Sequence, residues 1–127
     1  MPSMDMGDGR LDALVLKLRH PLAKIRSRAL RSLLFKLRER LVQWQELEPL
    51  QTALVPSLLA CLEPPLELDA LHVLQLMMQS DSDVFLSSLH HFGAAQKLQR
   101  AAQATPELQA TYEKVYRLYR ARYKGDT

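Results

Sequence analysis

The sequence predicts an all-α protein built as a stack of about six or seven helices, and three observations support this. Leucine dominates a composition that is 47% hydrophobic but only 6% aromatic and poor in β-branched residues, which disfavours β-sheet. Residues 20–41 show the apolar periodicity of an α-helix. The chain also repeats its own pattern at a spacing of about 40 residues. At 127 residues it has the length of a single domain with one modest core.

The helix predicted over residues 20–41 has two unlike faces. At 100° per residue, its apolar side chains fall within one half-circle, which we expect to face the core. They are Ile25, Ala29, Leu30, Leu33, Leu34, Leu37 and Leu41. The opposite arc forms the basic stripe, Lys24, Arg28, Arg31, Phe35 and Arg38. Arg26 falls inside the apolar arc, so we expect its stem to pack while its guanidinium reaches an acid or helix-end carbonyls; a partner-facing charge is the alternative.

Proline, glycine and polar turns delimit the other helices. His20-Pro21 ends a short helix that begins near residue 10, because a residue before proline disfavours the α conformation. Gly93 is predicted to end a helix with a positive φ angle, and the polar turn 80–83 is predicted to cap that same helix at its start. The long helix should reach about residue 43. The remaining helices are expected over 49–62, 66–79, 83–91, 94–103 and 105–123.

Comparison of the chain with itself indicates three copies of one helical pattern. Three sets of landmarks lie 40 residues apart: Leu14, Leu54 and Ala94; Leu18, Leu58 and Leu98; Leu22, Leu62 and Ala102. Ala29-Leu30-x-x-Leu33 matches Ala70-Leu71-x-x-Leu74 at a shift of 41. Ala110 follows 40 residues later, with Lys114 in the place of the last leucine, so we expect a degenerate third copy. Helical units of about 40 residues are typical of armadillo and HEAT arrays, and the predicted fold is an armadillo/HEAT-like right-handed stack.

Three features of the sequence indicate the domain boundaries and the compartment: the polar ends, the short apolar runs and the single cysteine. The helical domain is expected over residues 10–123, between a disordered N-terminus, 1–9, and a disordered tail, 124–127. No apolar run approaches the ~20 residues of a membrane span and no signal-peptide core is evident, so we expect a soluble, intracellular chain without membrane insertion. The single cysteine, Cys61, is expected to be a buried small hydrophobe in a reducing compartment.

Two regions carry the resemblance of this chain to a known family. The segment LVLKLRHPLAKIRSRALRSLLFKLRERL, residues 14–41, resembles the opening of the N-terminal domain of the rotatin family in its short helix, His-Pro turn and Ile25-Arg-x-Arg-Ala-Leu30 helix. LHHFGAAQKLQ, residues 89–99, is similar to a helix start after a glycine in the same domain. The resemblance covers nearly the whole chain and implies an armadillo-like domain at the start of a much longer protein.

The same resemblance implies a location and a role. Members of the rotatin family are centrosomal and ciliary basal-body proteins that take part in centriole assembly and ciliogenesis. The chain would then be a fragment that acts as a protein-binding scaffold in the cytoplasm and cytoskeleton, with centrosomal protein partners. The family brings no catalytic residues to this chain.

Patterns that would indicate chemistry are absent from the sequence. The four histidines, His20, His72, His90 and His91, have neither a cysteine pair nor a His-Glu-x-x-His motif beside them, so we expect no metal site. The lone cysteine has no activating partner, and the four glycines form no phosphate-binding loop. The sequence therefore predicts no enzyme, no cofactor and no small-molecule substrate.

Two surfaces are candidates for partner binding. The basic stripe could be an ordinary solvated face, but an aromatic residue among arginines favours a protein contact. The alternative function is a HEAT-like nucleic-acid-binding domain that uses the basic helices. Residues 17–40 hold nine of the 17 basic residues and 114–124 hold five, whereas 41–96 hold seven acidic residues and no basic one, which argues against a continuous phosphate-binding groove.

The second candidate surface is a tyrosine stripe on the last helix. It consists of all four tyrosines, Tyr112, Tyr116, Tyr119 and Tyr123, at spacings of four, three and four residues. One interpretation is core packing with hydroxyls at the edge. The other is a face covered by a further unit, which would support weak self-association through this helix.

Overall fold

A computed structural model describes residues 11–123, which contain helices and no β-strand. Residues 11–17 are helical and are followed by seven α-helices. These are α2 (Ala23–Arg38), α3 (Trp44–Leu47), α4 (Gln51–Ala60), α5 (Glu67–Gln79), α6 (Asp83–His91), α7 (Ala94–Ala104) and α8 (Gln109–Arg122). Two 3-10 turns, η1 (Glu48–Leu50) and η2 (Pro106–Leu108), lead into α4 and α8. The segments expected to be disordered, 1–9 and 124–127, lie outside the described residues.

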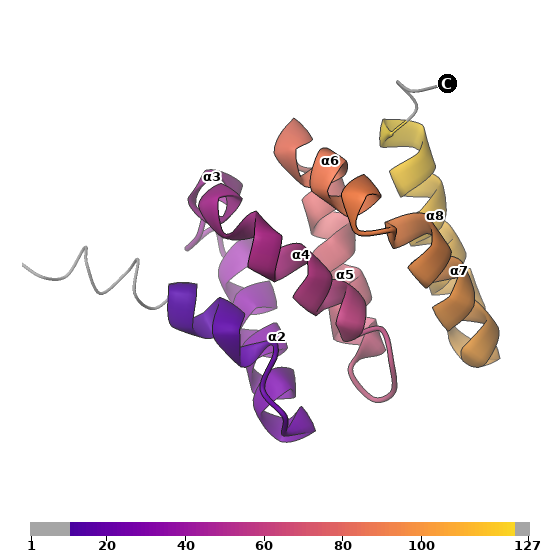
Figure 1. Ribbon diagram of the computed structural model, residues 1–127, viewed down its shortest axis with the longest axis horizontal. Coiled ribbons are helices and arrows are strands. Elements are labelled where there is room, and N and C mark those ends of the chain that lie inside the picture. The colour runs from indigo at the N-terminus through magenta and orange to yellow at the C-terminus, as the bar shows by residue number, and fades with distance from the viewer. Residues whose placement is uncertain (1–10, 124–127) are drawn as a thin grey trace, which may run out of the picture.

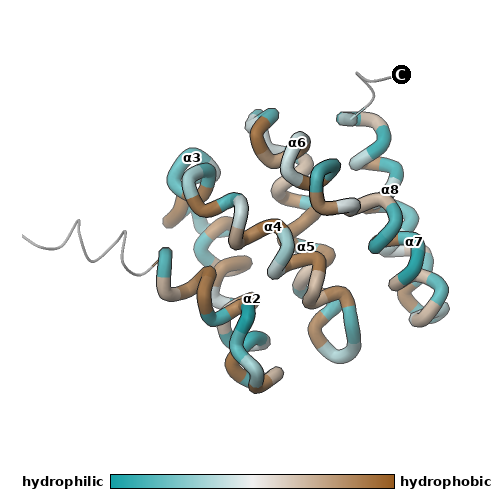
Figure 2. The backbone as a smooth tube through the Cα atoms, in the orientation of Figure 1, coloured by the Kyte–Doolittle hydropathy of each residue, from teal (hydrophilic) through white to brown (hydrophobic). Residues whose placement is uncertain are grey.

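The helices form a stack, which confirms the predicted all-α helical fold. The long helices α2, α5 and α8 lie side by side, with α5 packed against both of the others (Figure 1). The shorter helices form a second row, in which α4 packs against α6 and α7, and α7 packs against α8. Hydrophobic residues concentrate in α4 and α5 at the centre of the stack, whereas α7 is largely hydrophilic (Figure 2).

Two units of three helices can be distinguished, each with a short helix, a second helix and a long helix. They are α3–α4–α5 and α6–α7–α8, and residues 11–17 with α2 form a shorter first unit. The short helices of the two full units meet through Trp44 and Phe85, whose rings are 5.2 Å apart in an edge-to-face arrangement. Two or three helices per repeat is the arrangement of HEAT and armadillo arrays.

The long helices α5 and α8 run parallel, as the polar contacts between their matching ends show. Near the N-terminal ends of α5 and α8, the Tyr112 hydroxyl donates to Glu67 Oε2 at 2.5 Å. At the C-terminal ends, Nη1 of Arg122 donates to the carbonyls of Met78 and Ser80, the latter at 3.0 Å. The last long helix, α8, is thus held to α5 near both of its ends.

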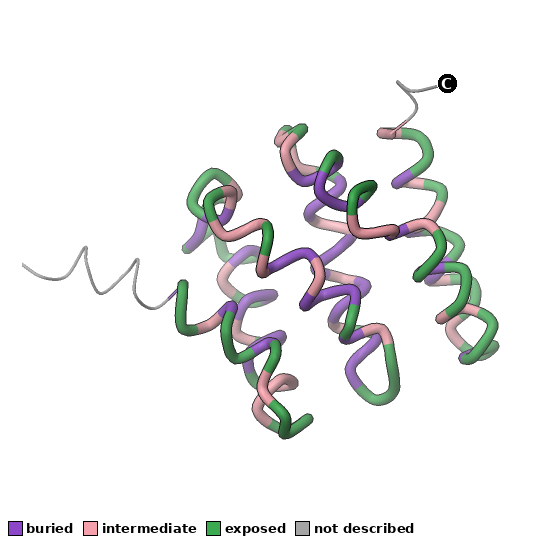
Figure 3. The backbone as a smooth tube through the Cα atoms, viewed as in Figure 1, coloured by how far each residue is buried: buried purple, intermediate pink, exposed green. Residues whose placement is uncertain are grey.

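The third unit is not degenerate, which corrects the alignment that placed Ala110 and Lys114 at core positions. Both of these residues are exposed. The buried residues of the long helices instead recur at 41 throughout: Leu30, Leu71 and Tyr112; Leu33, Leu74 and Val115; Leu37, Met78 and Tyr119 (Figure 3 shows the burial along the chain). The helix over 11–17 and the second helices α4 and α7 keep a period of 40, with Leu18, Leu58 and Leu98 all buried.

The two periods differ because the separation between the buried leucine before the connection and the first of these buried residues of the long helix grows by one residue from unit to unit. The separations are 30 − 18 = 12, 71 − 58 = 13 and 112 − 98 = 14 residues. A comparison at one fixed shift therefore misplaces the last long helix by one position, which turns its apparent face by about 100°.

The helix α2 ends at Arg38 rather than near residue 43, because the backbone reverses at Arg40, which has a φ of 58°. The N–H of Arg40 donates to Leu37 O at 3.2 Å and the N–H of Leu41 to Lys36 O at 2.8 Å. This is the hydrogen-bond pattern of a Schellman motif, here with arginine where glycine is usual. As a result Leu41, predicted on the core face, is 62% exposed, and Val42 enters the core instead.

The ends of α4 and α6 agree with the sequence only in part. Gly93 lies in the turn that follows α6 and has a φ of 73°, which confirms the predicted positive φ angle at this helix end. Ser82 is the N-cap residue of α6 but makes no capping bond, because its hydroxyl donates to Glu48 Oε2 at 2.7 Å. The predicted helix over 49–62 is shorter, since η1 precedes α4 and α4 ends at Ala60.

Candidate functional site

The basic stripe lies on the exposed face of α2, with all of its residues exposed to solvent: Lys24, Arg28, Arg31, Phe35 and Arg38. Their spacings of four, three, four and three residues place them in one row along the helix. Phe35 is 58% exposed, although large aromatic side chains usually find cover in a core. Leu34 and Leu37 on either side of Phe35 are buried, so the packing of α2 turns Phe35 toward solvent.

The charges of the stripe are largely unneutralised by the rest of the chain. Arg31 Nε lies 3.7 Å from Asp69 Oδ2 of α5, and the Arg31 side chain is 76% exposed. An exposed pair at this distance contributes only about 0–1 kcal/mol, so it leaves Arg31 free to turn toward another carboxylate. Within residues 11–123, Lys24, Arg28 and Arg38 form no salt bridge.

Arg26 does not belong to the stripe, and the expectation that its stem packs while its guanidinium reaches carbonyls is confirmed. Its Nη1 donates to His20 O at 2.7 Å and to Pro21 O at 3.1 Å. Nη2 lies 3.7 Å from Glu63 Oε2. Arg26 therefore holds the turn before α2 against the connection that follows α4, which is a structural role.

Sequence reasoning did not find the part of α5 that adjoins the stripe. At the shift of 41 that relates the long helices, Arg28, Arg31 and Phe35 correspond to Asp69, His72 and Leu76. All three of these α5 residues are partly exposed, and Leu68 beside them is 43% exposed. Nδ1 of His72 is enclosed there without a hydrogen-bond partner in the described chain. The surface beside the stripe is thus apolar and weakly acidic, and the 41-residue period was the signal that could have located it.

The tyrosine stripe does not form one surface, which corrects its reading as a single self-association face. Tyr112 and Tyr119 are buried in the core, as the core-packing interpretation expected. The Tyr116 hydroxyl accepts a hydrogen bond from Gln99 Nε2 at 3.2 Å. The Tyr123 ring stacks on His90, with ring centroids 4.5 Å apart, and on Tyr119 at 5.6 Å. Only Tyr116 and Tyr123 are even partly open to a partner.

The buried hydroxyl of Tyr112 is a donor to a carboxylate rather than a reactive group. Glu67, its acceptor, is only 5% exposed. Burial, and then the hydrogen bond and the negative charge of Glu67, raise the pKa of Tyr112 well above its usual value. The hydroxyl therefore keeps its proton and its bond to Glu67 at neutral pH.

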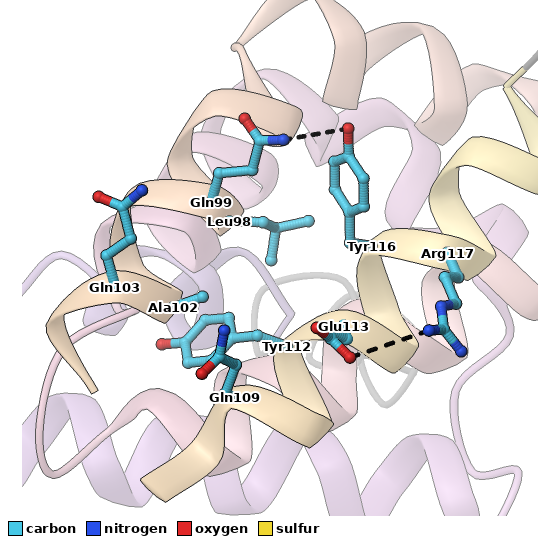
Figure 4. Close-up of a pocket in the computed structure, with 9 residues that line it drawn as sticks. All are labelled: Leu98, Gln99, Ala102, Gln103, Gln109, Tyr112, Glu113, Tyr116 and Arg117. Atoms are coloured by element: carbon cyan, nitrogen blue, oxygen red, sulfur yellow. Dashed lines mark hydrogen bonds and ion pairs between the residues drawn. The ribbon is translucent and has the colours of Figure 1, made fainter. Parts of the chain in front are cut away.

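A cavity between α7 and α8 opens at the C-terminal end of the stack (Figure 4). Its lining is mostly amide, phenol and apolar: Leu98, Gln99, Ala102, Gln103, Gln109, Tyr112, Glu113, Tyr116 and Arg117. Gln99 and Tyr116 bond across it, and Glu113 and Arg117 face each other at 3.9 Å. Such groups can hydrogen-bond a polar molecule, but the lining contains no Ser, Cys, His or Lys beside a base that could act as a nucleophile.

The remaining chemically active side chain, Cys61, is buried, as predicted. Its Sγ lies 3.8 Å from Leu18 O as a hydrogen-bond donor. Burial raises the pKa of the thiol, which disfavours the nucleophilic thiolate. Within residues 11–123 no three His, Cys, Asp or Glu side chains are grouped to hold a metal ion. In the same range no helix combines the length and the apolar character that crossing a membrane would require.

Comparison with known proteins does not assign this surface to a family. No protein-family model, curated protein or solved structure matches the chain. The rotatin resemblance therefore stays a prediction, and the function has to be argued from the exposed face of α2 and its surroundings.

Proposed function

We propose that this chain is a non-enzymatic protein-interaction scaffold domain that uses the basic stripe as its docking surface. The observation that carries the proposal is Phe35, which is 58% exposed on a helix whose leucines are all buried. Aromatic residues and arginines are the side chains that most often dominate the binding energy of protein interfaces. Phe35 lies one helical turn from Arg31 and one from Arg38, so both residue types occur in one row.

The rigidity of α2 supports this role. The helix packs on α5, and it is fixed before its first turn by Arg26 and after its last turn by the reversal at Arg40. A surface that is ordered before binding loses less conformational entropy when a partner arrives. The stripe therefore projects from a helix backbone that is already formed before a partner binds.

The resemblance to the rotatin family supports a more specific role. We propose that the partners are centrosomal proteins and that the domain serves centriole assembly and ciliogenesis at the centrosome and the cilium basal body. An armadillo-like stack of helices suits such a scaffold, because it presents extended faces to other proteins.

Proximity labelling or co-purification from cells tests the proposal. The domain is compared with a Phe35→Ala/Arg31→Glu variant, and far-ultraviolet circular dichroism establishes that both are folded. A Leu16→Ala/Arg100→Glu variant, which also loses one exposed apolar side chain and reverses one exposed arginine, serves as the matched control. We expect centrosomal proteins with the domain and the control but not with the stripe variant; unchanged recovery with the stripe variant contradicts the proposal.

The alternative, nucleic-acid binding through the basic helices, is less well supported by the same surface. The two basic helices, α2 and α8, lie on opposite sides of α5, which has no lysine or arginine and places Asp69 beside the stripe. A phosphate backbone that followed the long helices would cross this uncompensated segment. If the domain bound DNA or RNA with an affinity that falls steeply with salt, and if reversal of Arg28 and Arg31 flattened that slope, the alternative would be supported.

A further inference from the structure

We infer that the basic stripe accepts an acidic peptide segment of a partner protein, with one large apolar side chain seated on Phe35 and carboxylates on both sides of it. The inference rests on the proposed function and specifies the chemistry of its partner. Two properties of α2 lead to it, the unbalanced charge of the helix and the order in which charged and aromatic side chains follow one another.

The charge of α2 calls for an acidic partner. The helix contains six lysines and arginines and no aspartate or glutamate: Lys24, Arg26, Arg28, Arg31, Lys36 and Arg38. The chain itself neutralises Arg26 with Glu63 and, more weakly, Arg31 with Asp69. Apart from Lys36, the positive charge that is left lies along one exposed row, so a complementary surface has to supply several carboxylates.

The order of side chains along the row calls for an apolar residue among those carboxylates. Phe35 lies about 6 Å along the helix axis from Arg31 and about 4.5 Å from Arg38. An apolar partner side chain placed on Phe35 would bury both and remove water from the ion pairs on either side, which strengthens them. A purely acidic segment would leave Phe35 exposed, and a purely apolar one would leave the arginines unpaired.

The neighbouring surface of α5 favours a peptide over a nucleic acid. Asp69 repels a phosphate backbone, whereas the exposed Leu68 and the half-buried Leu76 of the same helix can extend an apolar contact. Asp69 also competes with an incoming carboxylate for Arg31. Removal of the Asp69 charge should therefore tighten the binding of an acidic peptide. If Arg31 binds a peptide carboxylate, this effect should exceed the small gain expected from the change in net charge alone.

The experiment uses short peptides as probes. The row from Lys24 to Arg38 is about 21 Å long, and an extended seven-residue peptide spans a similar length. The probe is fluorescein-labelled Glu-Glu-Glu-Leu-Glu-Glu-Glu, with two matched peptides in which leucine is replaced by serine or all glutamates by glutamine. Fluorescence anisotropy measures the Kd for the folded full chain at low and at high salt.

We expect the leucine-centred acidic peptide to bind about tenfold more tightly than the glutamine peptide and about fivefold more tightly than the serine peptide. Phe35→Ala should abolish the preference for leucine over serine without abolishing the salt dependence. Arg28→Gln/Arg38→Gln should weaken both acidic peptides, whereas Lys97→Gln/Arg100→Gln on exposed positions of α7, with the same change of net charge, should not. Asp69→Asn should tighten the binding of the acidic peptide about twofold. The gain should be larger in the chain that retains Arg31 than in the Arg31→Gln variant.

Several outcomes overturn the inference. They are equal affinity for the glutamine peptide, no loss in the Arg28→Gln/Arg38→Gln variant relative to its α7 control, or a leucine preference that survives Phe35→Ala. A duplex DNA oligonucleotide that binds more tightly than the acidic peptide and is indifferent to Phe35→Ala also overturns it. If the stripe variant loses cellular partners while the acidic probe fails to bind, the inference fails and the proposed function stands.

Discussion

The contact between Tyr112 and Glu67 is expected to make one of the largest single polar contributions to the stability of the stack. It joins α8 to α5, it is buried, and its acceptor is a carboxylate that is 5% exposed. Tyr112→Phe keeps the ring and its packing but removes the donor, so that a buried carboxylate loses its hydrogen bond. A hydrogen bond to a charged group contributes about 1.5–3 kcal/mol, and we expect the free energy of unfolding to fall by about 2 kcal/mol.

Urea unfolding followed by circular dichroism measures this change. A loss of about 2 kcal/mol should also lower the Tm by roughly 6–10 °C for a chain of this size. Tyr116→Phe is the matched control, because the Tyr116 hydroxyl is a partly exposed acceptor for Gln99 and its loss should cost less than about 0.5 kcal/mol. A double-mutant cycle with Glu67→Met, which removes the acceptor, should give a coupling energy above about 1 kcal/mol. A Tyr112→Phe chain within about 0.5 kcal/mol of the parent would refute the reasoning.

Three further predictions concern single residues. Arg40→Gly should raise the free energy of unfolding, measured in urea, by about 0.5–1 kcal/mol. A left-handed arginine costs roughly 1–2 kcal/mol, and the greater flexibility of glycine in the unfolded chain offsets part of this gain. A lower free energy of unfolding in the variant would contradict the prediction. Arg26→Met should cost about 1–2 kcal/mol through its two lost carbonyl bonds, whereas Arg28→Met should stay within about 0.5 kcal/mol, and equal effects would show that the Arg26 bonds contribute nothing. Burial raises the pKa of Cys61, so on raising the pH the unfolded chain loses the thiol proton before the folded chain does. The free energy of unfolding should therefore fall as the pH rises above about 8.5. Cys61→Ala should reduce this pH dependence, and an unchanged pH dependence would rule out the thiol as its source.

The sequence predicted the helical class and the residues of the core of α2 because both depend on local periodicity. Leu30, Leu33 and Leu37 recur at helical spacing, and they are buried as this spacing requires. The basic stripe followed from the same periodicity, since the face opposite an apolar arc must meet solvent. Where one helix alone decides which face is buried, the pattern was sufficient.

Features that depend on how one helix meets the next could not be read in this way. Because the backbone reverses at Arg40, Val42 lies in the core in place of Leu41. Arginine has no preference for the left-handed conformation, so its presence did not predict this reversal. The separation between the buried residues of successive helices grows by one residue from unit to unit, and this moved the core of α8 from Lys114 to Val115. The position of Asp69 beside Arg31 required the packing of α2 on α5, which no single helix contains.

The polar contacts between consecutive long helices bear on how the stack comes apart. Arrays of repeats tend to lose their terminal units first, because each terminal unit has only one neighbour. Here α8 is tethered to α5 near both ends, through Tyr112 with Glu67 and through Arg122 with the carbonyls that close α5. Opening α8 alone would leave a buried carboxylate and the end of α5 without these partners, so the two contacts raise the free energy of partial unfolding. The last helix should then show more amide-exchange protection than the end of an array without such contacts, and Tyr112→Phe should lower that protection.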